Sequence, residues 1–271
     1  NDWLKKEIET LNSLKNLTIK TRTSLAAYHN YNYLLARENL TDHLEKKDKN
    51  NKVRQRLLKI RAKRVILATG ALERPLVFNN NDRPGIILST AVKKYADFFG
   101  VKCGEKNVFF TNNDSAYESA LCLHNKGIKV DAIVDIRDNS NSKIVKAVEQ
   151  AGIKIYWSHT IVDTNGYRRL SNISIMRLSN DGMTVTGKRI NISCDCLGVA
   201  GGWTPAVHLF TQSGGKLKFD EDNNVFLPNK YPSDQISVGS CNGNFNLKEI
   251  INELSIKLKE FLKIDQTDFH N

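Results

Sequence analysis

The chain has 271 residues, which is enough for one large domain or two ordinary ones. Apolar residues make up 40% of the sequence and charged residues 25%, as in an ordinary globular protein. No run of eighteen apolar residues occurs, so we expect no membrane span. The first residues read as the start of an amphipathic helix and not as a signal peptide.

The chain is basic, with a formal net charge of +11 and a pI near 9.4. Such a charge is compatible with binding to nucleic acid or to another acidic surface. Much of the excess falls in residues 46–64, and no aromatic residue is interleaved there, which disfavours single-strand binding by base stacking. We therefore interpret this stretch as a solvated hairpin and loop and expect no nucleic-acid partner.

The five cysteines follow neither a zinc-binding pattern nor the framework of a secreted disulfide-rich protein. Cys194 and Cys196 are expected on the same side of one strand, as buried thiols. A reducing, cytoplasmic location is the expectation. The cysteines are Cys103, Cys122, Cys194, Cys196 and Cys241.

The amino-terminal part predicts a helix followed by a small antiparallel meander that feeds a sheet. Apolar residues recur near helical spacing up to about Leu14, and Asn1 can cap this helix. Strands are expected at 17–20, within 28–40 and at 53–60, with the polar stretch 41–51 as a hairpin tip.

Residues 63–75 contain the first informative motif. Val65 to Leu67 predicts a buried strand that runs into Ala68, Thr69 and Gly70. Small side chains let the backbone approach a bulky ligand, and Gly70 can adopt a positive φ. Open α/β sheets bind ligands just outside the carboxyl ends of their strands.

A β-α-β unit follows a turn at 79–85 and a helix at 90–99 that Ser89 is expected to cap. Its turn, residues 111–115, has no glycine, whereas a nucleotide-binding turn normally carries Gly-x-Gly-x-x-Gly. Asp114 would repel a pyrophosphate, although Asp135 ends the second strand where an acid could hold a ribose. On balance, these residues disfavour a nucleotide-binding role for this unit. The unit comprises a strand at 107–110, a helix at 116–125 and a strand at 130–135.

The second half repeats the strand-exit motif. A helix is expected at 142–151, capped by Ser142, and strands follow at 153–157 and 160–162. A meander is expected next, with an Asn180-Asp181-Gly182 turn and strands at 172–178, 184–186 and 189–194. Residues 195–205 are again a strand, small residues and a proline.

The carboxyl-terminal part adds a third strand that ends in small residues, near Gly239 and Ser240, and a closing helix at 247–262. His208 has no carboxylate at a useful spacing, so we interpret it as a helix-face histidine and not as a catalytic base. No carboxylate pair, Ser-His-Asp set or metal-binding cluster is evident, and we assign no catalytic or metal-binding residue.

Four motifs in this order resemble the alpha subunit of heterotetrameric sarcosine oxidases, with a likeness that runs from about residue 22 to about residue 243. They are ATGALERPLVF (68–78), NDRPG (81–85), TNNDSAY (111–117) and AGGWTP (200–205). More broadly, the arrangement resembles the glutathione-reductase-like flavoproteins. This resemblance implies an α/β fold of two Rossmann-like, three-layer dinucleotide-binding domains with antiparallel β-meanders. The first, incomplete at its amino terminus, would comprise residues 1–78 and 206–271, and the inserted second domain residues 79–205.

The resemblance also implies a function. Such complexes oxidatively demethylate sarcosine to glycine, with hydrogen peroxide and a folate-linked one-carbon unit as further products. They use FAD and FMN, with NAD held in the alpha subunit, which assembles with beta, gamma and delta subunits. Ala68, Thr69, Gly70, Gly239 and Ser240 would lie against the dinucleotide. Relatives of the glutathione-reductase type place Gly-Asp at the end of the last strand, whereas no aspartate follows Gly239 here, which is consistent with NAD in place of FAD.

Two alternatives stay open. One is a subunit of an FAD- and NAD(P)-dependent amine, opine or cyanide-forming dehydrogenase. A related disulfide reductase is disfavoured, because this chain has no Cys-x-x-Cys pair. The other is a non-catalytic basic scaffold module, whose binding would fall steeply with salt. We expect this piece to need further segments or partner chains for stability and to be inactive alone, because a partial sheet exposes an apolar edge.

Overall fold

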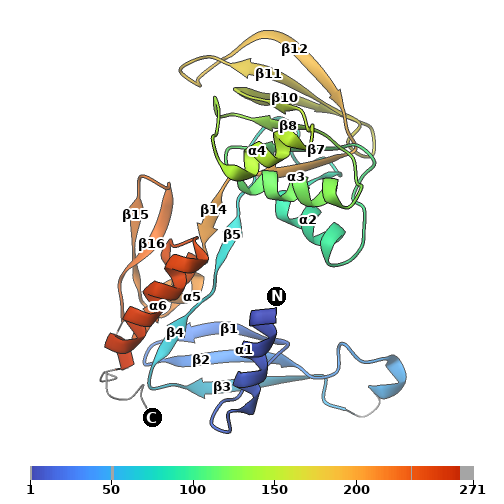
Figure 1. The fold of residues 1–271 in the computed structure, drawn as a ribbon. Helices are drawn as coiled ribbons and strands as arrows, with labels where there is room; N and C mark the ends of the chain where they lie inside the picture. Colours follow the sequence, from blue (N-terminus) through green and yellow to red (C-terminus); the bar gives the residue numbers. More distant parts are fainter. Residues whose placement is uncertain (1, 50–51, 233, 263–271) are drawn as a thin grey trace. The chain divides into compact units, whose positions relative to one another are not determined.

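The computed structural model describes residues 2–49, 52–232 and 234–262 (Figure 1). The chain divides into two compact units, which we describe separately: unit 1 is Asn1–Ala71 with Pro205–Asn271, and unit 2 is Leu72–Thr204. Strands β5 (Ala71–Glu73) and β14 (Trp203–Pro205), which pair with each other, contain the two crossings. The first crossing follows residue 71, whereas the predicted domain bound is residue 78.

Unit 2 is built on a five-stranded parallel sheet with the order β6-β13-β7-β8-β9. Its three central strands are buried along almost their whole length. They read as continuous apolar runs because a parallel sheet is covered on both faces. The strands are β6 (Ile86–Leu88), β7 (Asn107–Thr111), β8 (Val130–Asp135), β9 (Ile155–Tyr156) and β13 (Cys196–Ala200).

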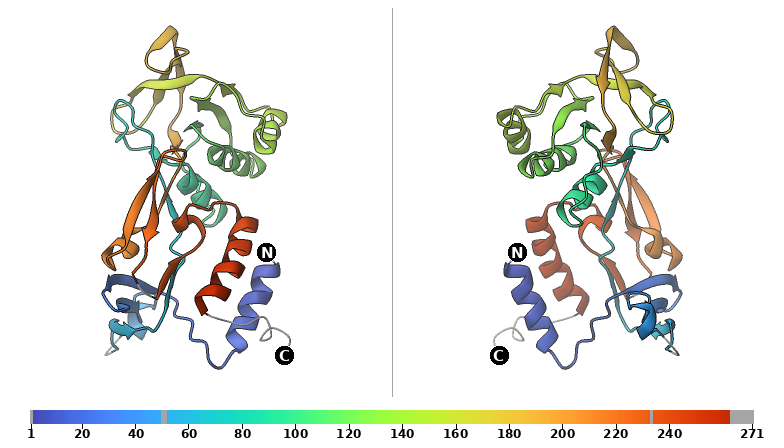
Figure 2. Two further views of the ribbon diagram at one scale, coloured as in Figure 1. Left: turned by 90° about the vertical axis from the view of Figure 1, so that its left-hand side faces the viewer. Right: turned by 90° about the vertical axis from the view of Figure 1, so that its right-hand side faces the viewer.

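Helices cover one face of this sheet and an antiparallel sheet covers the other (Figures 1 and 2). Phe109 and Ile133 pack toward the helices, whereas their neighbours Phe110 and Val134 pack toward the second sheet, since successive strand residues face opposite sides. The three-layer α/β arrangement is thus the predicted one. The covering elements are α2 (Ser89–Asp97), α3 (Ser115–Asn125), α4 (Lys143–Gln150), β10 (His159–Asn165), β11 (Asn172–Leu178) and β12 (Val185–Ser193).

Two helix starts in unit 2 test the predicted caps. The Ser142 hydroxyl accepts a hydrogen bond from the Val145 N–H at 3.4 Å, which confirms Ser142 as the cap of α4. The prediction for Ser89 was wrong: Leu88 occupies the cap position, and Ser89 is the buried first residue of α2, where its hydroxyl donates to Ser119 at 2.9 Å.

Unit 1 combines a three-stranded antiparallel meander, a two-stranded parallel sheet and a hairpin. Its core gathers Tyr28 and Leu34 from the meander, Val65 and Leu67 from β4, and Phe210 from α5. The expected cap of the first helix, Asn1, lies outside the described residues. The elements are α1 (Asp2–Ser13), β1 (Thr23–His29), β2 (Tyr33–Asn39), η1 (Lys46–Asp48), β3 (Gln55–Arg61), β4 (Val65–Leu67), α5 (His208–Gln212), β15 (Lys216–Asp220), β16 (Val225–Lys230), β17 (Gln235–Ser237), η2 (Gly239–Asn242) and α6 (Leu247–Leu262).

Several local predictions are corrected. Residues 17–20 form no strand, and the first strand of the chain as described, β1, begins at Thr23. The strands expected at 184–186 and 189–194 are one continuous strand, β12. Cys194 and Cys196 are both buried, but they lie in separate core clusters on opposite faces of the parallel sheet, because β12 ends before Cys194 and β13 starts at Cys196.

A bilayer crossing requires a helix of about 20 mostly apolar residues, and no helix within the described ranges meets that requirement.

Candidate functional site

The candidate site of unit 1 lies at the carboxyl ends of β4 and β17. These strands run parallel, with Val65, Ile66 and Leu67 opposite Gln235, Ile236 and Ser237. The Val238 N–H donates to the Leu67 carbonyl at 3.0 Å and extends the ladder by one bond. Because parallel strands end at the same edge, the segments 68–70 and 238–240 are brought together there.

Backbone donors are available at this edge. Ala68 and Thr69 are exposed and Gly70 is half-buried. In the described part of the chain their three N–H groups donate to no other group. Unpaired backbone N–H groups at the end of a strand can bind an anion such as a pyrophosphate.

Two glycines turn the backbone at this edge. Gly70 has φ +75° and Gly239 has φ +73°, a region that side chains with a Cβ rarely adopt. A Cβ at Gly70 would meet nothing within 4 Å, so the space beside the free donors is open. Both positions therefore need glycine for conformation, and Gly70 also leaves room for a ligand.

Three contacts that the sequence did not indicate fix the shape of this edge. The Thr69 hydroxyl donates to the Ala206 carbonyl at 2.8 Å, and the Ala206 N–H donates to the Gly70 carbonyl at 3.0 Å. The buried Cys241 thiol contacts the Leu67 carbonyl at 3.3 Å. These contacts join residues more than a hundred positions apart, and no local signal in the sequence indicates them.

The β-α-β crossing of unit 2 is closed by its own side chains. Asp135, at the end of β8, is 0% exposed. Its carboxylate accepts hydrogen bonds from the Arg137 backbone N–H at 2.9 Å, from the Arg137 guanidinium at 2.8–3.2 Å and from the Tyr117 hydroxyl at 2.8 Å. An acid that is engaged on both oxygens is not available to a ribose.

Arg137 also closes the turn where a pyrophosphate would lie. Its Nη1 is 2.8 Å from the Asp114 carboxylate, so one guanidinium bridges the ends of β7 and β8. Burial raises the pKa of the Tyr117 hydroxyl, and the charge of Asp135 raises it further, so Tyr117 stays a proton donor. Asn113 is committed to Ser115 through its side-chain oxygen. This geometry favours the interpretation that the crossing has no nucleotide role.

Comparisons with known proteins bear on these two sites. No protein-family model matches the chain. Sarcosine oxidase subunit alpha from Corynebacterium sp. (strain P-1) is 36% identical over 246 residues, which cover 90% of this chain and 25% of that protein. The same subunit from Corynebacterium sp. (strain U-96) is 34% identical over 241 residues, 89% of this chain and 25% of that protein.

This chain is related to one segment of the sarcosine oxidase alpha subunits. It spans about a quarter of the length of the curated relatives that it matches. The relationship confirms the resemblance inferred from the four sequence motifs.

Solved structures confirm the fold class. The T. acidophilum thioredoxin reductase superposes with a TM-score of 0.60 at 15% identity, covering 89% of this chain and 72% of that chain. The L-proline dehydrogenase from P. horikoshii superposes with a TM-score of 0.55 at 21% identity, covering 87% and 40%. At these identities the likeness concerns the α/β fold alone.

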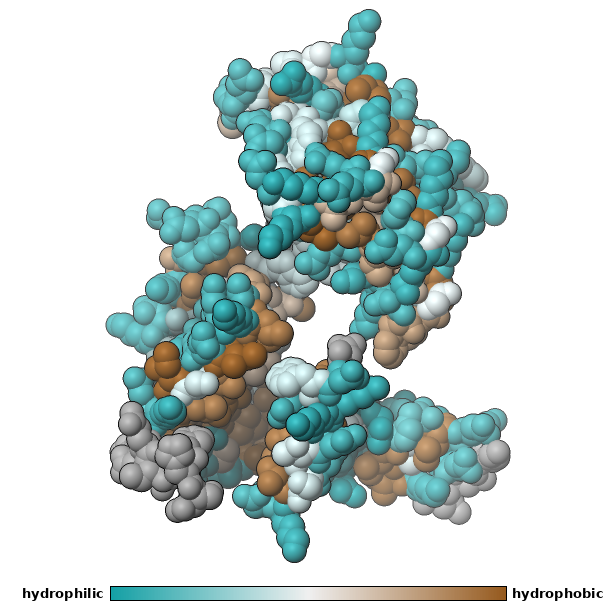
Figure 3. Space-filling model, viewed as in Figure 1, coloured by the Kyte–Doolittle hydropathy of each residue, from teal (hydrophilic) through white to brown (hydrophobic). Residues whose placement is uncertain are grey.

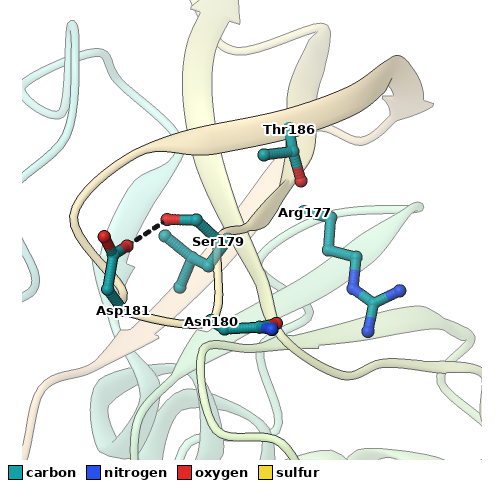
Figure 4. Close-up of a pocket in the computed structure, with 6 residues that line it drawn as sticks. Arg177, Ser179, Asn180, Asp181 and Thr186 are labelled. Atoms are coloured by element: carbon teal, nitrogen blue, oxygen red, sulfur yellow. Dashed lines mark hydrogen bonds between the residues drawn. The ribbon is translucent and has the colours of Figure 1, made fainter.

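Three other features of this sarcosine oxidase relative form no ligand-binding or catalytic site among the described residues. His208 is exposed at the start of α5. No group of three or more metal-ligating side chains comes together among the residues that the structure describes. A polar hollow between β11 and β12 is lined by the turn itself (Figure 4). There Ser179 and Asp181 face each other and bond within the turn, while Arg177 lies apart from them. The lining residues are Arg177, Leu178, Ser179, Asn180, Asp181 and Thr186.

One buried acid in unit 2 predicts a pH dependence. Glu73 in β5 accepts hydrogen bonds from the Thr90 N–H and hydroxyl through one oxygen, and its other oxygen is buried without a partner in the described residues. Burial raises the pKa of Glu73, and the Thr90 hydrogen bonds lower it less. The folded chain thus binds this proton more tightly than the unfolded chain does, so the contribution of Glu73 to stability is lost as pH rises.

We therefore expect Glu73→Gln to flatten the pH dependence of stability. In the wild-type chain this contribution should fall from the unfolded pKa, about 4.3, up through the higher folded pKa. Urea midpoints measured across that window should decline less in Glu73→Gln. Glu149→Gln, at an exposed carboxylate of α4, is the matched control. Equal slopes in wild type and Glu73→Gln would contradict the expectation.

Proposed function

We propose that this chain supplies the dinucleotide-binding part of a sarcosine-oxidase-type enzyme, with unit 1 holding the dinucleotide. The observation that carries the proposal is the shared edge of β4 and β17, where three free backbone N–H groups adjoin two glycines of positive φ. Ala68, Thr69 and Gly70 would bind the pyrophosphate through their backbone, and Gly239 and Ser240 would line its other side. Unit 2 would serve as a structural domain.

The residues present fit NAD better than FAD in this proposal. After Gly239 the chain continues with Ser240 and Cys241, and no carboxylate follows β17 directly. The thiol of Cys241 is turned to the Leu67 and Val238 carbonyls and does not replace an acid. A nicotinamide dinucleotide supplies hydride chemistry when bound. The chain's own residues would bind and orient it, and we assign none of them a catalytic role.

The wider reaction is part of the same proposal. The complete enzyme would oxidatively demethylate sarcosine to glycine and release hydrogen peroxide and a folate-linked one-carbon unit, with FAD and FMN in the complex. The relatives are each named as subunit alpha of a sarcosine oxidase. Beta, gamma and delta chains would therefore be the partners of this chain.

Exposed apolar surface supports such partners or further segments. Apolar side chains gather over α6 in unit 1 (Figure 3), where Leu247, Ile251 and Ile256 are exposed. Helix α1 buries no residue, although Trp3 and Leu4 lie on it. Unpaired apolar surface of this extent marks an interaction site. We propose that other polypeptide covers these helices in the complete enzyme.

A release assay tests the proposed function. The enzyme is purified with its associated chains, denatured, and the released small molecules are identified by absorbance and mass, chain by chain. NAD released from this chain, with flavin from the rest of the complex, is the expected result. FAD released from this chain would favour an FAD-dependent amine dehydrogenase subunit instead. A folded complex that releases no dinucleotide would contradict the proposal.

A further inference from the structure

Strand β3 of unit 1 presents a free sheet edge. The meander has the order β1-β2-β3, and in the described part of the chain β3 pairs with β2 alone. The Leu40 N–H donates to the Arg54 carbonyl and the Ala62 N–H to the Asn32 carbonyl. In an antiparallel pair, hydrogen-bonded and non-bonded residue pairs alternate. These two bonds and the register therefore assign residues 54, 56, 58, 60 and 62 to the pairs that bond to β2. Residues 55, 57, 59 and 61 therefore direct their N–H and C=O groups outward, away from β2.

The side chains at these outward positions are exposed, and two of the four, Lys59 and Arg61, are basic. Leu57 is 60% exposed, and Lys59 and Arg61 are exposed on the same face of the strand. Lys52, Lys59 and Lys63 form no ion pair within the described ranges. Arg54 and Arg56 are paired with Asp42 and Glu38, so these two acids are already engaged. We call residues 52–63 the basic edge.

Charge decides which strand can pair with this edge. In a parallel in-register pairing, or in antiparallel registers centred on Lys59 or Ile60, a second copy of β3 would bring Lys59 against Lys59 or Arg61. Like charges directly opposite on a sheet are destabilising. Lysine on an edge strand is a common device against self-pairing. The same cations attract a strand that carries carboxylates at alternate positions, with an apolar side chain opposite Leu57.

We propose that the basic edge is a docking site for an extended acidic segment of a different chain, which adds to β3 as a fourth strand. The outward N–H and C=O groups of residues 55, 57, 59 and 61 would pair with the backbone of the segment. Lys59 and Lys63 would pair with its carboxylates. Residues 52–63 hold six Lys and Arg residues and no Asp or Glu, against a net charge of +11 for the whole chain. Strand addition gives this local positive charge a role that the proposed dinucleotide site does not need.

The test uses a fluorescein-labelled peptide that alternates glutamate and valine, added to the full chain and followed by fluorescence anisotropy. Lys59→Glu should weaken binding about tenfold or more, because an attraction becomes a repulsion. Lys188→Glu, on the exposed edge strand β12 of unit 2, changes the net charge equally and should leave binding unchanged. Equal loss in both variants would overturn the docking site.

A second pair of variants separates strand addition from simple charge attraction. Leu57→Ala and Leu57→Pro both remove the apolar side chain, but only proline removes the outward N–H, and no β2–β3 bond depends on that N–H. Leu57→Pro should lose binding several-fold beyond Leu57→Ala. The same test can be made on the unaltered protein with a peptide that is N-methylated at alternate residues. This peptide should bind the wild-type chain as weakly as the original peptide binds Leu57→Pro. Unchanged binding of the methylated peptide would overturn strand addition.

Two further outcomes also decide against the proposal. Binding of single-stranded DNA with a steep salt dependence, in the absence of peptide binding, would identify the basic edge as a nucleic-acid surface. A dimer in sedimentation that Lys59→Glu abolishes would identify the occupant as a second copy of the chain.

Discussion

Replacing Arg137 by alanine is expected to lower the free energy of unfolding of unit 2 by about 3–5 kcal/mol, the usual cost of removing one partner of a buried ion pair. Asp135 is fully buried, and the guanidinium supplies most of its hydrogen bonds. Without Arg137 the carboxylate keeps only the Tyr117 hydroxyl and a backbone N–H. The loss comes from an unpaired buried charge and not from a missing surface contact.

The Arg137 prediction is checked by urea unfolding. Near-ultraviolet circular dichroism of Trp157, which stacks on Tyr117 in unit 2, reports the relevant transition. Arg168→Ala, at an exposed arginine of the same unit, should change stability little. Adding Asp135→Asn to Arg137→Ala should recover part of the loss, because the uncompensated charge is gone. A loss no greater than that of Arg168→Ala would contradict the assigned role.

Gly70→Ala is expected to weaken dinucleotide binding by about tenfold or more, while stability falls by only about 1–2 kcal/mol for a left-handed residue with a Cβ. The added methyl group meets no atom of the described residues within 4 Å, so it takes up space beside the free N–H groups of residues 68–70. A ligand that binds through those donors must approach closely, and the methyl group opposes this approach.

The control for Gly70→Ala is closely matched. Gly100 in unit 2 also has a positive φ, +64° against +75°, and a Cβ there also meets nothing within 4 Å. Gly100→Ala should therefore carry the same backbone strain and leave binding intact. The affinity for NAD is measured by equilibrium dialysis on folded samples of both variants. Equal affinities in the two variants would show that the edge of β4 is not the binding site.

Local periodicity predicted several elements with their exact bounds. β8 is a short, largely apolar strand, β11 alternates polar and apolar residues over its first half, and α6 carries one apolar face over its whole length. The strand expected at 17–20 has the alternation of a strand, but Leu17 and Ile19 remain exposed because, among the described residues, no neighbouring strand pairs with them. β15 was missed although Lys216–Asp220 alternates basic and apolar residues, a weak signal in so polar a segment.

The candidate site was partly predictable for a related reason. Small residues after a strand point to a ligand edge, and the parallel pairing of β4 with β17 brings both predicted segments to one place. The contacts that shape the edge, such as Cys241 with Leu67, depend on tertiary structure alone. The same holds for the ion pair of Arg137 with Asp114, which forms only because β7 and β8 end side by side, whereas Asp135 lies two residues before Arg137 and is a local partner.

Hydrogen exchange with and without NAD tests most directly whether unit 1 holds the dinucleotide and unit 2 does not. The full protein is labelled with its associated chains present, and exchange is compared peptide by peptide. The account predicts slower exchange in peptides that contain residues 68–70 and 239–240, and no change in those that contain residues 111–116. Protection of residues 111–116 instead, or no protection at residues 68–70 with NAD bound, would contradict it.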